Sequence, residues 1–160
     1  MIEPIRRHVS VGCDPATAFR VFTTEMDTWW PLHVHSRAQQ EREDIVKAER
    51  IVVEERAGGR IYEVMSDGLE ADWGTILIWE PPERIVIAWQ PNGRPPNPTE
   101  LELRFAVEGE GTRVDLEHRG WERLGPEGGE AREDYAQGWP LTFDRLFAEA
   151  ADDAAQDAAQ

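Results

Sequence analysis

Several features are missing from this sequence of 160 residues, and each absence excludes a class of protein. Cys13 is the only cysteine, so an internal disulfide is impossible, and no cysteine and histidine pattern typical of a zinc site is present. No apolar run approaches the roughly 18 residues that a membrane span needs, and the first residues lack the apolar core of a secretory signal. We therefore expect a cytoplasmic protein.

Basic residues are also scarce. The chain has 17 lysines and arginines against 32 aspartates and glutamates, which gives a formal net charge of −15. Such a surface repels phosphate backbones and anionic lipid headgroups, so we expect neither nucleic acid nor a membrane as a partner. The sequence also lacks a phosphate-binding glycine loop, a G-x-S-x-G nucleophile elbow and an H-E-x-x-H motif, and no cofactor is expected.

Tryptophan, by contrast, is abundant, with seven residues. Between residues 131 and 147, aromatic and aliphatic side chains recur at steps of three and four, which predicts a long helix with one apolar face. These side chains are Tyr135, Trp139, Phe143, Leu146 and Phe147. Pro140 removes one backbone hydrogen bond, so the helix is expected to bend or restart next to Gly138. Residues 148–160 show no apolar face, and we expect this tail to fray.

The residues before this helix predict a succession of β-strands. Alternation of apolar and polar side chains is clearest over residues 101–107 and 114–118. Asp14 followed by Pro15 is typical of a helix start and predicts a short helix after the first strand. Residues 73–79 are apolar on both faces, so that strand is expected to be covered twice or to meet another subunit. Residues 32–47 and 91–98 are predicted to be loops.

This order of elements predicts one α+β domain over residues 1–147, in which a curved antiparallel sheet of six or seven strands wraps around the terminal helix. Four patches, residues 19–36, 71–89, 116–125 and 138–147, also resemble a known family in their order and spacing. The family is the bacterial SRPBCC (START-like) proteins related to the C-terminal domain of the Hsp90 ATPase activator.

The resemblance implies a helix-grip fold with an apolar cavity between sheet and helix. It also implies a choice of functions, because the superfamily includes lipid carriers, hormone receptors, polyketide cyclases and aromatases. The eukaryotic co-chaperones of the family carry a separate amino-terminal domain that this sequence does not show. Hsp90 is therefore not expected as a partner.

His118 is the sharpest candidate for chemistry. It shares strand parity with Val114 and Leu116, so its imidazole is predicted to point inward. There it would either orient a ligand and move a proton as a catalytic residue, or serve as a core histidine tied to a neighbouring carbonyl or carboxylate. No orienting partner is evident in the sequence.

Two further polar features have alternative interpretations. Glu63 shares parity with Ile61 and Met65, and it is either an inward carboxylate or, in the opposite register, a solvated residue. His33 and His35 form an H-x-H pair that lacks an obvious third ligand, so no metal is expected, and a position on the rim of a pocket is the alternative.

The tryptophans either fill a core or line a site for a flat apolar ligand. Our leading hypothesis is a protein that binds an apolar or aromatic small molecule in the cavity. The alternatives are an enzyme of cyclase or aromatase type that uses His118, and an interaction module, either chaperone-associated or a homodimer. The candidate ligand-binding residues are Trp30, His35, Glu63, Trp73, Leu77, Trp89, His118, Trp139 and Phe143.

Overall fold

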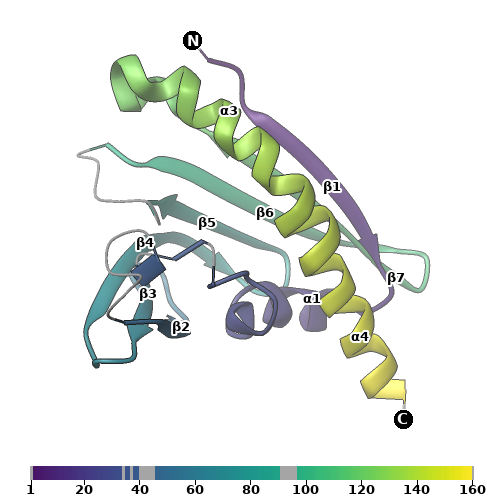
Figure 1. Cartoon of the computed structure of the whole chain (residues 1–160). Coiled ribbons are helices and arrows are strands. Elements are labelled where there is room, and N and C mark those ends of the chain that lie inside the picture. Colours follow the sequence, from purple (N-terminus) through teal and green to yellow (C-terminus); the bar gives the residue numbers. More distant parts are fainter. Residues whose placement is uncertain (1, 34, 37, 40–45, 91–96, 160) are drawn as a thin grey trace.

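In the computed structural model of the chain, a curved sheet wraps around one long helix (Figure 1). The described residues are 2–33, 35–36, 38–39, 46–90 and 97–159. The strands among them are β1 (Ile5–Val11), β2 (Ala48–Val53), β3 (Arg60–Met65), β4 (Glu70–Glu80), β5 (Arg84–Trp89), β6 (Thr99–Glu108) and β7 (Gly111–Arg119). The helical segments are α1 (Pro15–Phe22), η1 (Met26–Thr28), η2 (Trp121–Glu127), α3 (Gly128–Trp139), η3 (Pro140–Phe147) and α4 (Ala148–Ala159).

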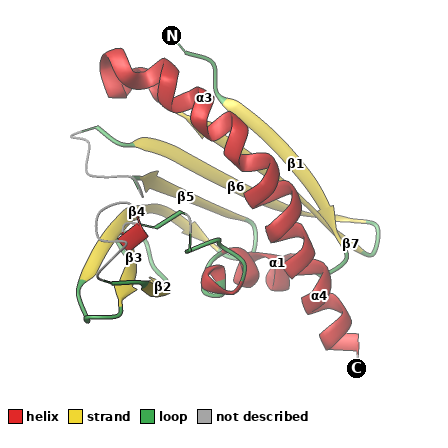
Figure 2. Ribbon diagram, viewed as in Figure 1, coloured by secondary structure: helices red, strands yellow, loops and turns green. Residues whose placement is uncertain are grey.

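The seven described strands form one antiparallel sheet in the order β1-β7-β6-β5-β4-β3-β2. Figure 2 shows the long helix crossing one face of this sheet, with α1 beside α4 at one end. Helix α1 begins as predicted, because the Asp14 carboxylate accepts a hydrogen bond of 2.8 Å from the Thr17 backbone N–H and Pro15 occupies the first turn. The α+β helix-grip arrangement expected from the sequence is confirmed.

Strand β4 departs from simple alternation. Its register against β3 shifts between Ile61 and Tyr62, and its register against β5 shifts between Ile76 and Ile78. Each shift places an extra residue in β4 and reverses the parity of the residues after it. Consequently Trp73 is fully buried, whereas Leu77 is 46% exposed. The expectation that Leu77 lines the cavity is therefore wrong.

The terminal helix changes its hydrogen-bond pattern at Pro140, as its missing N–H requires, but it does not break. Trp139 and Pro140 keep right-handed helical dihedral angles, and residues 140–147 form a π-helical segment, which has wider turns. Arg7 of β1 donates two hydrogen bonds to the Asp144 carboxylate, one of them 2.9 Å long from Nε, and so ties this segment to the sheet.

The residues after Phe147 correct a second expectation. Instead of fraying, they continue the helix as α4 to Ala159 and pack against α1 and β1. Ala151 is fully buried, and the Asp152 carboxylate accepts a hydrogen bond of 2.8 Å from the Gly12 backbone N–H. Alanine side chains let the helix approach α1 closely, so a surface without large apolar residues still docks. None of the described helices is both long and apolar enough to cross a membrane.

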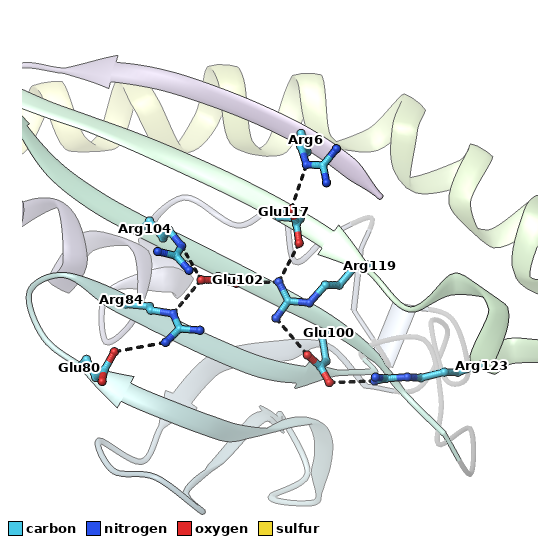
Figure 3. A network of polar contacts seen from close by, with 9 residues as sticks. All are labelled: Arg6, Glu80, Arg84, Glu100, Glu102, Arg104, Glu117, Arg119 and Arg123. Atoms are coloured by element: carbon cyan, nitrogen blue, oxygen red, sulfur yellow. Dashed lines mark hydrogen bonds and ion pairs between the residues drawn. The ribbon is translucent and has the colours of Figure 1, made fainter. Parts of the chain in front are cut away.

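The face of the sheet opposite the helix carries a network of ion pairs (Figure 3). Its centre is Glu102, which is 6% exposed and accepts hydrogen bonds of 2.7 Å from Arg84 and 2.6 Å from Arg119, with Arg104 at 2.6 Å. The other members are Arg6, Glu80, Glu100, Glu117 and Arg123. Because these residues come from several strands and η2, the network couples segments that are distant in the sequence.

Candidate functional site

Four tryptophans pack together between the sheet and the helix, and we call Trp30, Trp73, Trp89 and Trp139 the tryptophan cluster. Trp30 lies closest to its neighbours, with ring centroids 5.2 Å from Trp73 and 5.7 Å from Trp89. Trp73 and Trp89 are 6.0 Å apart with nearly perpendicular planes. These are the edge-to-face distances favoured by aromatic pairs in a packed core. The cluster therefore fills much of the space between the sheet and the helix.

A small pocket beside the helix stays open, and we call it the helix pocket. It has a volume of about 130 Å³ and is lined by Trp30, His35, Asp134, Tyr135, Gly138, Trp139 and Thr142. Four of these residues lie on one face of the helix, since positions 135, 138, 139 and 142 follow one another at steps of one, three and four residues. The other two lining residues, Trp30 and His35, precede β2 in the chain, and the Trp30 indole N–H donates a hydrogen bond of 2.7 Å to the His35 carbonyl.

Gly138 leaves part of the helix pocket unfilled. A Cβ atom placed on this glycine would meet no atom within 4 Å outside its own stretch of helix. Glycine in a helix costs roughly 0.5–1 kcal/mol relative to alanine, so the residue lowers helix stability while it leaves space at the pocket wall. From the sequence, Gly138 was expected only to lie next to a bend in the helix. Its position at the pocket wall was not predicted.

His118 points inward as predicted but does not line the helix pocket. It is fully buried, and the rings of Trp121 and Tyr135 lie 4.1 Å and 4.7 Å from its own. Nδ1 accepts a hydrogen bond of 3.2 Å from the Trp139 indole N–H. Nε2 must then carry the proton, and it donates to the Thr99 hydroxyl at 2.8 Å.

The Thr99 hydroxyl continues this chain by donating to the Trp89 carbonyl at 3.2 Å. Both nitrogens of His118 are therefore occupied in the neutral imidazole. Burial lowers the pKa of His118 from 6.5 to about 3, because the charged form would lose its solvation. The structure favours the interpretation as a core histidine, and it shows a hydroxyl and an indole as partners in place of the expected carbonyl or carboxylate.

Glu63 also points inward, and the solvated alternative is wrong. The side chain is fully buried, and its carboxylate accepts hydrogen bonds of 2.8 Å from the Trp73 indole N–H and from the Ala38 backbone N–H. It thereby joins the segment that follows Trp30 to strand β3. Glu63 does not line the helix pocket, and neither of these two partners does.

The remaining candidates are divided between pocket and core. His35 lines the helix pocket, in agreement with a position on the rim, whereas Phe143 is buried in the core and stacks on Phe147 at 5.5 Å. Tyr135, Gly138, Thr142 and Asp134 line the pocket although none was a candidate. Their helical spacing was the signal that would have found them. Among the described residues, no three histidine, cysteine or acidic side chains are grouped as metal ligands would be.

Comparison with known proteins places this geometry in a family. The chain is 30% identical to an anthrahydroquino-gamma-pyrone synthase, Txn09, over 93% of its own length and 97% of that chain, with a TM-score of 0.61. It is 27% identical to CalC, a self-sacrificing resistance protein from Micromonospora echinospora, over 97% of this chain and 95% of that chain, with a TM-score of 0.63.

An AHSA1-like protein from Aeromonas hydrophila shares the fold, with 18% identity over 95% of this chain and 94% of that chain and a TM-score of 0.64. A search of the curated proteins gave no match. The family model described as activator of Hsp90 ATPase homolog 1-like protein matches residues 13–151. The chain therefore belongs to the family of activator of Hsp90 ATPase homolog 1-like proteins.

Proposed function

We propose that this protein binds a planar aromatic small molecule in the helix pocket. The observation that carries the proposal is the pocket wall itself. The rings of Trp30, Tyr135 and Trp139 border it, and Gly138 leaves a space that any other side chain would occupy. Aromatic walls with a few polar groups are typical of sites for flat apolar ligands.

The volume of the helix pocket limits the size of the ligand. An apolar cavity of about 150 Å³ binds benzene, and a water molecule takes up roughly 30 Å³. With about 130 Å³, the pocket takes a ligand of one or two small rings as it stands. A larger fused-ring system requires displacement of Trp30 and His35, which belong to a loop and not to the sheet.

The relatives support an aromatic ligand. The synthase that is 30% identical takes its name from an anthrahydroquino-gamma-pyrone, a fused-ring aromatic product. That activity belongs to the synthase. For this chain we take from it the class of ligand, because the tryptophan cluster and the helix pocket supply aromatic surfaces of their own.

Replacement of Gly138 by leucine tests the proposal. The leucine side chain should occupy the helix pocket and weaken binding of indane by at least about tenfold, because the ligand and the side chain compete for one space. The free energy of unfolding should stay constant or rise by up to about 1 kcal/mol, because leucine favours the helix. Binding is measured by NMR titration of the seven tryptophan indole N–H signals.

Gly129→Leu is the matched control. Gly129 lies in the same helix, and a Cβ there also meets no atom within 4 Å, but the residue does not line the helix pocket. This variant should bind indane like the wild type. If indane shifts no indole signal of the wild type, or if the two leucine variants bind it equally well, the proposed function is wrong.

Proton transfer by His118 is not part of this proposal. A general base needs a nitrogen within hydrogen-bond reach of the substrate. In His118 the Trp139 N–H occupies the acceptor nitrogen, and Tyr135 and Trp139 separate the imidazole from the pocket. If the protein is an enzyme of cyclase type, His35 and Asp134 are candidates for proton transfer, because both line the pocket.

A further inference from the structure

Thr142 differs from two other polar residues of the helix pocket in its burial. Asp134 and His35 line the pocket and are exposed, whereas Thr142 lines the same pocket and is only 4% exposed. Asp134 and Thr142 lie about two helical turns apart. The lining therefore combines exposed polar groups with one buried hydroxyl.

The Thr142 hydroxyl has no hydrogen-bond partner within the described part of the chain. It does not bond back to the helix as the buried Thr23 does, whose hydroxyl donates to the Phe19 carbonyl at 2.7 Å. Trp89 Nε1 is the only fully enclosed side-chain atom without a partner among the described residues, so the Thr142 oxygen keeps some accessible surface. Because Thr142 is otherwise buried and lines the helix pocket, this surface faces the pocket.

The charges of the lining disfavour an anionic ligand. Among the described residues, no lysine or arginine lines the helix pocket, whereas the Asp134 carboxylate does. The chain as a whole has a formal net charge of −15. A negative potential repels carboxylates and attracts hydrogen-bond donors. The pocket therefore favours a neutral ligand that carries a donor.

A hydroxyl group on the ligand meets both conditions. The threonine hydroxyl has one donor and two acceptor sites, so a second hydroxyl pairs with it in either direction, whereas a carbonyl oxygen can only accept. We infer that the ligand of the helix pocket is a neutral phenol whose hydroxyl group binds the hydroxyl of Thr142. This inference rests on the proposed function and names its ligand class. A plain hydrocarbon would fill the same space and leave a buried hydroxyl without a partner.

Probes that share one ring system test the ligand class. 5-Indanol is indane with one hydroxyl group on the aromatic ring, and the wild type should bind it at least about fivefold more tightly than indane. Indane-5-carbaldehyde carries only an acceptor at that position, and indane-5-carboxylate carries a negative charge. Both should bind more weakly than 5-indanol at pH 7. Tighter binding of either one than of 5-indanol would overturn the inference.

Thr142→Val tests the assigned residue, because it keeps the shape of the side chain and removes the hydroxyl. The preference for 5-indanol over indane should disappear in this variant, since the ligand hydroxyl loses water without gaining a partner. Thr142→Ser restores the hydroxyl and should restore the preference. Thr75→Val makes the same change at an exposed strand residue that does not line the pocket, and it should keep the wild-type preference.

Urea unfolding of Thr142→Val gives a readout without ligand. The midpoint should stay constant or rise, because the hydroxyl makes no hydrogen bond that the variant could lose. A marked fall of the midpoint, equal binding of indane and 5-indanol by the wild type, or a preference that survives in Thr142→Val would overturn the inference. In each case indane still binds, and the proposed function stands. Failure of both probes to bind the wild type would overturn the proposed function as well.

Discussion

The free energy of unfolding is expected to fall by about 2–3 kcal/mol between pH 7 and pH 4.5 because of His118 alone. The unfolded histidine has a pKa near 6.5, whereas burial lowers the folded value to about 3. Between these values the unfolded chain binds more protons than the folded chain. The stability contributed by neutral His118 is therefore complete above pH 6.5 and is lost as the pH falls toward 3. Urea unfolding at a series of pH values measures the slope.

His118→Gln identifies the source of that slope. Glutamine has no proton to gain in this range, so the free energy of unfolding of the variant should be nearly constant between pH 7 and pH 5. It should also be less stable at pH 7, by about 1–3 kcal/mol, because the Trp139 N–H and the Thr99 hydroxyl lose well-aligned partners. His35→Gln is the control at an exposed histidine and should keep the wild-type slope. An unchanged slope in His118→Gln would contradict the assignment.

Glu102→Gln should lower the free energy of unfolding by about 2–3 kcal/mol at pH 7. Removal of one partner from a buried ion pair costs roughly 3–5 kcal/mol, and the partial exposure of Arg84 and Arg119 reduces this figure. The variant leaves three guanidinium groups without the carboxylate at their centre. Chemical denaturation with circular dichroism measures the loss.

Glu110→Gln makes the same change of charge at an exposed turn residue and should alter stability by less than about 0.5 kcal/mol. If the two variants are equally stable, the network does not stabilise the sheet.

The pH dependence of stability gives a second test of Glu102. Burial alone would raise the pKa of Glu102, but its hydrogen bonds from Arg119 and Arg84 and the charge of Arg104 lower it overall. The contribution of Glu102 is therefore present above the unfolded pKa near 4.5 and is lost at more acid pH, below the range from pH 7 to pH 4.5 over which the effect of His118 is measured.

Side-chain parity explains how much of the interior was predictable. In a regular strand every second side chain points to the same face, so Val114 and Leu116 predicted the inward position of His118. The same rule gave the inward position of Glu63. It failed for Leu77, because β4 contains extra residues relative to β3 and β5. These extra residues are defined by the pairing with the neighbouring strands and cannot be recognised in the sequence of β4 itself.

By itself, the sequence determined the α+β class, the order of strands along the chain, the start of α1 at Asp14 and the apolar face of the terminal helix, because each depends on local spacing and backbone preference. The tertiary structure alone decided that Trp73 and Trp89 fill the interior while Trp139 borders an opening, and that Ala151 docks against the core. It also decided that the nitrogens of His118 are paired and that of Trp89 is not, within the part of the chain that the structure describes. Cavities and hydrogen-bond pairs depend on how side chains from distant segments pack together in one volume. This packing cannot be predicted from the periodicity of residues along the chain.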